Sequence, residues 1–226
     1  MKKINYLAII PARKGSKRLK NKNLKKIGKK TLLDLTIEAA LKSTKIKKII
    51  LTTDIKKYLK IKNKKIFTVS RPNNLVQDSS TTESAIEHAI KIFNKNKNYQ
   101  IDNIVLLQPT SPLRNFKDIN EAIRLFINKK CDSLLSAYVQ KICTWKKKGS
   151  GYYLPKNYLI SKYKTVGGQF QKEEIIENGA IYIFNYHLFL KYKVRLFKKI
   201  GIYFMNKKNS VEIDTAEDFN LAKLLY

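Results

Sequence analysis

Runs of apolar, often β-branched residues alternate along this chain with stretches whose apolar residues recur at helical spacing. The short apolar runs predict strands at residues 6–10, 49–54, 66–69, 102–108, 132–138, 178–184 and 200–205. The intervening stretches predict helices at residues 31–43, 56–65, 80–93, 115–128, 186–191 and 215–226. Strands that alternate with helices favour an α/β fold with a Rossmann-like, doubly wound, mostly parallel sheet.

Three polar clusters predict helix starts. Ser80 and Glu83 have the spacing of a capping box, in which each side chain bonds to the other residue's backbone. Asn115 with Asp118, and the cluster at residues 215–218, predict caps for two later helices.

The regular pattern is lost over residues 139–172, which are rich in lysine, tyrosine and glycine. A stretch of this length without clear structure inside a compact domain usually forms a lid, a binding loop or a subunit contact. We therefore expect one domain over residues 1–226, with 139–172 as a dimerisation or lid excursion.

The formal net charge of +30 changes the picture less than its size suggests. Only six of the 47 cationic residues are arginines, and the lysines are spread among many Asn and Ile residues, as a compositional bias would produce. No nucleic-acid-binding motif accompanies the charge, so we expect no specific nucleic-acid partner. No apolar stretch approaches membrane-spanning length, so we expect a cytoplasmic protein without a membrane span.

The most cationic loop follows the first strand, at the edge where open α/β sheets bind ligands. It contains Arg13, Lys17 and Lys22 around a flexible Gly15-Ser16 corner, but it is neither a Walker A motif nor a dinucleotide-binding motif. Its backbone N–H groups and cations could hold phosphate oxygens. From the residues alone, a solvated basic loop is an equal alternative.

Two further groups of polar residues could complete a site. Glu212 and Asp214 lie two apart, so in an extended segment both carboxylates point to one face and could hold Mg²⁺. The alternative for Asp214 is a helix cap. Gln108 and the polar residues after it, at the end of a central strand, suit recognition of a sugar or base, or form a proline-braced connection. The chain lacks a nucleophile–base pattern, which favours phosphoryl or nucleotidyl transfer over covalent hydrolysis.

Four motifs together resemble the CMP-N-acylneuraminate cytidylyltransferase (CMP-sialic acid synthetase) family. They are Ile9-Ile10-Pro11-Ala12-Arg13-Lys14-Gly15-Ser16-Lys17-Arg18 followed by Asn21-Lys22-Asn23, then Leu106-Leu107-Gln108-Pro109-Thr110-Ser111-Pro112-Leu113-Arg114, then Asn178-Gly179-Ala180-Ile181-Tyr182-Ile183, and finally Glu212-Ile213-Asp214-Thr215. Arg71-Pro72 with residues 78–82 resembles the family's nucleobase-side loop. The resemblance spans nearly the whole chain in the right order.

The resemblance implies a nucleotide-diphospho-sugar transferase type of fold and a Mg²⁺-dependent enzyme. Such an enzyme transfers CMP from CTP to the anomeric hydroxyl of an acidic 2-keto sugar, of the sialic, legionaminic or pseudaminic acid type, and releases pyrophosphate. It implies catalytic roles for Arg13, Lys17 and Lys22 on the triphosphate, with Ser16 in the same binding loop. Asn23, Arg71 and Thr82 would lie beside the cytidine, Gln108 and Lys146 on the sugar side, and Glu212 and Asp214 on the metal. Homodimers are common in this family.

The chain also departs from the family pattern on the sugar side. Family members that use sialic acid tend to carry one arginine just before a glutamine ahead of the Asn178-Gly179-Ala180 stretch, and often another shortly before that asparagine. The corresponding residues here are Gly168 and Ile176. The acceptor carboxylate would then meet Lys146, Lys162, Lys164 or Lys172, or the sugar differs. A CMP-Kdo synthetase-like activity and a catalytically silent nucleotide-binding homologue stay as alternatives.

Overall fold

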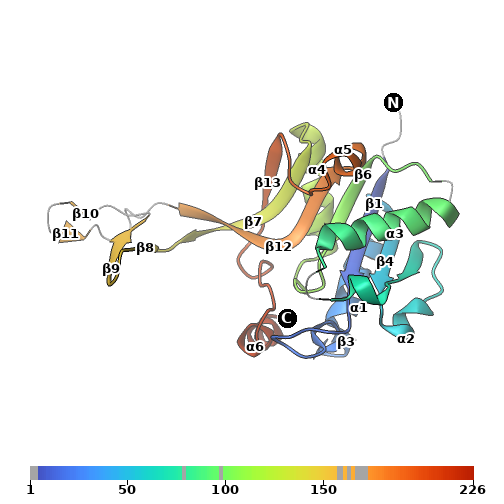
Figure 1. Ribbon diagram of the computed structural model, residues 1–226, viewed down its shortest axis with the longest axis horizontal. Coiled ribbons are helices and arrows are strands. Elements are labelled where there is room, and N and C mark those ends of the chain that lie inside the picture. The colour runs from blue at the N-terminus through green and yellow to red at the C-terminus, as the bar shows by residue number, and fades with distance from the viewer. Residues whose placement is uncertain (1–4, 78–79, 97–98, 157–159, 162–163, 166–172) are drawn as a thin grey trace.

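A seven-stranded sheet forms the centre of the protein, shown as a computed structural model in Figure 1. The structure describes residues 5–77, 80–96, 99–156, 160–161, 164–165 and 173–226. The strand order is β13-β7-β12-β6-β1-β4-β5, with β1 at Tyr6–Ala12, β4 at Ile46–Thr53, β5 at Ile66–Ser70, β6 at Asn103–Leu107, β7 at Ser133–Lys141, β12 at Glu173–Asn185 and β13 at Ile200–Phe204. Only β12 runs antiparallel to its neighbours in this sheet, and the other pairs are parallel. The predicted mostly parallel α/β fold is confirmed.

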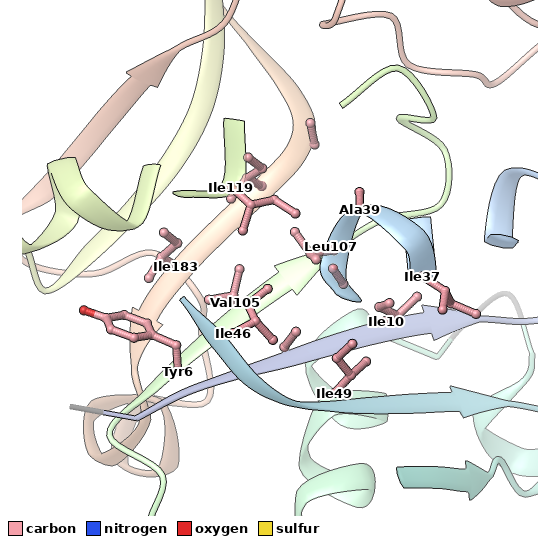
Figure 2. Close-up of a cluster of buried hydrophobic side chains, with 14 of the residues drawn as sticks. Tyr6, Ile10, Ile37, Ala39, Ile46, Ile49, Val105, Leu107, Ile119 and Ile183 are labelled. Carbon is pink, nitrogen blue, oxygen red and sulfur yellow. The ribbon is translucent and has the colours of Figure 1, made fainter. Parts of the chain in front are cut away.

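Helices cover both faces of the sheet because successive residues of the central strands point to opposite sides. From β1, Ala8 and Ile10 join a buried cluster with α1 (Leu32–Lys42) and α4 (Phe116–Asn128), part of which Figure 2 shows. Leu7 and Ile9 join a second cluster with α3 (Thr82–Asn96) and α5 (Tyr186–Tyr192). A third, smaller cluster forms where α6 (Ala216–Leu225) meets the start of α1.

Two of the three predicted caps are confirmed. Asn115 with Asp118 forms a capping box at α4, and Thr215 with Asp218 forms one at α6. The predicted box at Ser80 and Glu83 is wrong, because Thr81 Oγ1 accepts the Ser84 N–H at 3.1 Å instead. Glu83 lies in the first turn of α3, where its carboxylate pairs with Arg195.

Helix and strand bounds differ from the pattern where charge outweighs apolar content. The helix expected over 56–65 ends after one turn as α2 (Lys56–Leu59), and the lysine-rich residues that follow have too few apolar partners to extend it. Residues 211–214 form no strand, but Ile213 N–H donates to Thr110 O at 2.8 Å. That bond holds the segment beside the loop that follows β6.

The prediction of irregular structure over 139–172 is wrong in part. β7 and β12 continue past the sheet as a two-stranded arm, where Glu173 pairs with Lys141 and Glu177 with Ala137. Short strands follow near the far end of this arm (Figure 1): β8 at Trp145–Lys148, β9 at Tyr152–Pro155, β10 at Ile160–Ser161 and β11 at Lys164–Thr165. Strands that bury no face carry no apolar alternation, which is why the pattern missed them. Lys162, Gly168 and Lys172 lie outside the described residues.

Two turns of 3-10 helix and one short hairpin complete the framework. A turn of 3-10 helix at Lys22–Leu24 leads into the hairpin of β2 (Lys26–Ile27) and β3 (Lys30–Thr31), and a second turn of this kind lies at Asn73–Leu75. Within the described part of the chain, no helix has both the length and the apolar composition that crossing a bilayer requires.

Candidate functional site

A cleft of about 580 Å³ opens at the carboxyl ends of β1 and β6. Ten of the eleven site residues expected from the sequence line it, namely Arg13, Ser16, Lys17, Lys22, Asn23, Arg71, Thr82, Gln108, Glu212 and Asp214. These residues come from five separate segments of the chain. Lys146 does not line this cleft, because it lies in β8 on the projecting arm.

The cationic loop is fixed in place by bonds to its neighbours. Arg13 Nη1 donates to Val76 O at 3.1 Å, and the Asn23 side-chain amide donates to Arg13 O at 2.8 Å. Lys14 N–H donates to Asp54 Oδ1 at 2.7 Å, while Leu19 is buried in the third cluster. The loop is therefore an ordered wall of the cleft, and Asn23 braces it from within.

Lys22 joins the two ends of the chain. Its Nζ lies 2.9 Å from Asp214 Oδ1 and donates to Ile213 O at 2.7 Å, with only 14% of the side chain exposed. Arg18 Nη1 lies 3.0 Å from the other oxygen of Asp214. Sequence reasoning left Arg18 out of the site, because nothing in the loop distinguishes it from the surrounding lysines.

Glu212 and Asp214 face the cleft because the residue between them faces the core. Ile213 is fully buried in the third cluster, so the flanking carboxylates point the other way. Burial raises the pKa of Glu212, and the negative charge of Asp214 raises it further. A site that makes a carboxylate harder to ionise favours a cation beside it.

The two carboxylates suit a magnesium ion in chemistry. Mg²⁺ prefers oxygen ligands, usually one or two carboxylates together with substrate phosphates and water. Among the described residues, no group of three or more His, Cys, Asp or Glu side chains could hold a metal without such help. The fit therefore depends on a phosphate ligand sharing the ion.

The backbone around Glu212 is shaped to receive its carboxylate. Gly179 in β12 has φ = 65°, and a Cβ built there would lie 2.8 Å from Glu212 Oε1. Gln108 Nε2 donates to Gly179 O at 3.0 Å, which ties the end of β6 to the same point of β12. Because a carbonyl can only accept, the Gln108 amide nitrogen faces β12.

Arg114 is a buried positioning residue behind this junction. It is 2% exposed, and its Nη1 lies 3.3 Å from both Gln108 O and Ala180 O. Burial lowers its pKa to about 10, so it stays protonated at neutral pH. It bridges β6 and β12 where their pairing ends.

Arg71 and Thr82 form a second wall of the cleft. Arg71 Nη2 donates to Thr52 O at 3.1 Å, and burial lowers the pKa of Arg71 to about 10. Thr82 begins α3, next to Ser80 and Thr81, which also line the cleft. The wall thus offers one cation and several hydroxyl groups.

Comparison with known proteins adds independent information. The cytidylyltransferase family model matches residues 7–226. The chain is 34% identical over 227 residues to the N-acylneuraminate cytidylyltransferase of Escherichia coli O18:K1:H7, covering 96% of this chain and 51% of that protein. It is 29% identical over 229 residues to a pseudaminic acid cytidylyltransferase of Campylobacter jejuni, covering 97% and 95%. The chain thus spans about half the length of the E. coli relative.

The fold is shared with solved structures of lower identity. A CMP:2-keto-3-deoxy-manno-octonic acid synthetase complexed with CTP aligns with a TM-score of 0.68 at 14% identity, covering 98% of each chain. At that identity the likeness concerns the fold. The family match over nearly all of the chain shows that this protein belongs to the cytidylyltransferase family.

Proposed function

We propose that this protein transfers CMP from CTP to the anomeric hydroxyl of a nonulosonic acid sugar and releases pyrophosphate. The observation that best supports this proposal is the cleft, in which cations of the loop after β1 lie beside the carboxylates of Glu212 and Asp214. The sugar oxygen forms a bond to the α-phosphorus, the bond from that phosphorus to the α–β bridging oxygen breaks so that pyrophosphate leaves, and the hydroxyl proton passes to water.

The protein's contribution to such a transfer is positioning and charge stabilisation rather than covalent chemistry. Arg13, Lys17 and Lys22 would hold the triphosphate, with the corner at Ser16 beside them. Lys22 already contacts Asp214, so one cation would serve both the carboxylate and a phosphate oxygen. Asn23, Arg71 and Thr82 would surround the cytidine.

Mg²⁺ is the cofactor in this proposal, held by Glu212 and Asp214 with phosphate oxygens. When bound, it would neutralise negative charge on the phosphates. The raised pKa of Glu212 is consistent with this assignment, because burial and the charge of Asp214 make its ionised form costly and a cation beside it would reduce that cost.

The acceptor class rests on the relatives. The relatives compared above are named for N-acylneuraminate and pseudaminic acid, so we propose an acceptor of the sialic, legionaminic or pseudaminic acid type. A CMP-Kdo synthetase-like activity is less well supported, because that likeness is one of fold at 14% identity.

We also propose a cytoplasmic homodimer formed through the arm. Tyr152, Tyr153 and Leu154 on β9 are 69%, 57% and 49% exposed, and large apolar side chains exposed together often mark an interaction surface. In such a dimer, Lys146 would reach the sugar only in the cleft of a second copy.

The experiment is to incubate the protein with CTP, Mg²⁺ and a panel of sugar acids and to measure pyrophosphate release. Release with a nine-carbon acid supports the proposal, and release with Kdo alone favours the eight-carbon alternative. CTP binding without release from any acid would indicate the silent homologue. If random DNA stabilises the protein against unfolding and CTP does not, the protein is a polyanion-binding protein.

A further inference from the structure

Arg195, in the segment between α5 and β13, has no part in the site described so far. Its guanidinium lies over the ring of Tyr182, with the central carbon 4.6 Å from the ring centroid. Its Nη1 lies 3.1 Å from Glu83 Oε1 in the first turn of α3. An arginine held flat on an aromatic ring has its planar donor edge oriented in advance.

This residue contacts two elements that border the cleft. Its partner Glu83 is next in sequence to Thr82, which lines the cleft, and its partner Tyr182 lies in β12, the strand that also carries Gly179. The Tyr182 hydroxyl donates to Glu177. Burial raises the pKa of Tyr182. The hydrogen bond to Glu177 and the negative charges of Glu177 and Glu212 raise this pKa further, whereas the positive charge of Arg195 lowers it. The Tyr182 ring therefore links Arg195 to the strand that carries both Glu177 and Gly179.

The cations that line the cleft are gathered elsewhere. Arg13, Lys17, Arg18 and Lys22 come from the loop after β1, and Arg71 from the segment after β5. Arg18 and Lys22 already contact Asp214. On the strand that carries Gly179, residue 176 is an isoleucine, which offers no charge. An acceptor carboxylate that faces β12 would therefore need a cation from outside the loop after β1.

We propose that Arg195 binds the carboxylate of the sugar acid and so determines that the acceptor is an acid, an inference that rests on the proposed function. Glu83 occupies only Nη1 of a group with five N–H donors. Both partners are partly accessible, at 28% and 25% side-chain exposure. Glu83 thus holds the cation in place, and the acceptor carboxylate accepts from the remaining donor edge.

The test compares two cations that are placed alike but only one of which lies over Tyr182. Lys193 pairs with Glu87, one helical turn after Glu83, and is the matched control. Kinetics are measured for wild type, Arg195→Met, Arg195→Lys and Lys193→Met, with the best sugar acid of the panel and with its methyl ester. Thermal unfolding of each variant separates a loss of fold from a loss of binding.

We expect Arg195→Met to raise KM for the acid by about tenfold or more, since a hydrogen bond to a charged group is worth about 1.5–3 kcal/mol. KM for CTP stays unchanged, and the preference for acid over ester falls toward one. Arg195→Lys restores part of the preference, and Lys193→Met matches wild type.

The inference is overturned if Arg195→Met keeps the wild-type preference for acid over ester. It is also overturned if Lys193→Met loses that preference equally. A wild-type protein that releases no pyrophosphate with any sugar acid refutes the proposed function itself, and is distinguished by its inactivity before any variant is made.

Discussion

Gly179 offers the sharpest test of how the carboxylate pair is positioned. Replacing it with alanine adds one methyl group at a residue with φ = 65°, where an added Cβ would lie 2.8 Å from Glu212 Oε1. Ordinary van der Waals contact begins near 3.4 Å, so Glu212 must retreat by roughly 0.6 Å. Displacements approaching 1 Å in a catalytic group can cost about a hundredfold in rate.

Gly149 provides the matched control, because it shares the left-handed conformation without the close contact. Its φ is 64°, and the nearest atom to an added Cβ is in the Tyr152 ring at 4.0 Å. Both alanine variants incur the left-handed penalty of about 1–2 kcal/mol. Only Gly179→Ala also moves a carboxylate of the site.

The assay is kcat/KM for pyrophosphate release as a function of Mg²⁺ concentration, together with urea unfolding. We expect Gly179→Ala to lose about ten- to a hundredfold in kcat/KM and to need more Mg²⁺, while Gly149→Ala keeps both values. Equal activity and equal Mg²⁺ dependence in the two variants would refute the idea that Gly179 positions Glu212.

Three further predictions concern the charged groups of the cleft. Lys22→Ala should abolish turnover, because the cation proposed to hold the triphosphate beside Asp214 is lost, while the protein still unfolds cooperatively. Lys20→Ala, at an exposed lysine of the same loop, is the control. Near-normal turnover of Lys22→Ala would count against the phosphate role. Asp214→Ala should make activity collapse even at saturating Mg²⁺, and an unchanged Mg²⁺ titration would contradict the metal assignment. Glu212→Gln should stabilise the fold at neutral pH. The folded-state pKa of Glu212 is raised above its ordinary value of 4.5, so ionisation costs stability as pH rises from that value through the folded pKa. Thermal melts should therefore show a gain for Glu212→Gln at pH 7.5 that disappears below about pH 4.5, and a gain of equal size at both would contradict the burial argument.

Local pattern carried much of the fold and of the site. Alternating strands and helices were enough to predict a mostly parallel sheet, because each element's buried face leaves its own period in the sequence. Charge concentrated after a buried strand made Arg13, Lys17 and Lys22 candidates, and a spacing of two made Glu212 and Asp214 candidates. The resemblance of the surrounding motifs to a known family was needed to choose the site over a solvated loop and a helix cap.

Tertiary structure decided which distant groups meet. Lys22 and Asp214 are 192 positions apart, and neither residue's own neighbours in sequence indicate that they form an ion pair. The capping box at Ser80 and Glu83 failed because Thr81 caps the helix instead, and the Glu83 carboxylate pairs with Arg195, 112 positions away. Pairing between residues so far apart depends on how the chain closes on itself.

The arm and the stacking of Arg195 on Tyr182 could not be predicted from the sequence pattern. Strands that bury no side chains leave no period, so β8 and β9 were invisible in the sequence. Arg195 looked like one cation among many in a chain of charge +30. The sequence by itself determined the family, the sheet and the composition of the cleft. Only the folded chain decided which charges neutralise one another, because electrostatic interactions depend on distance in space and on burial rather than on order along the chain.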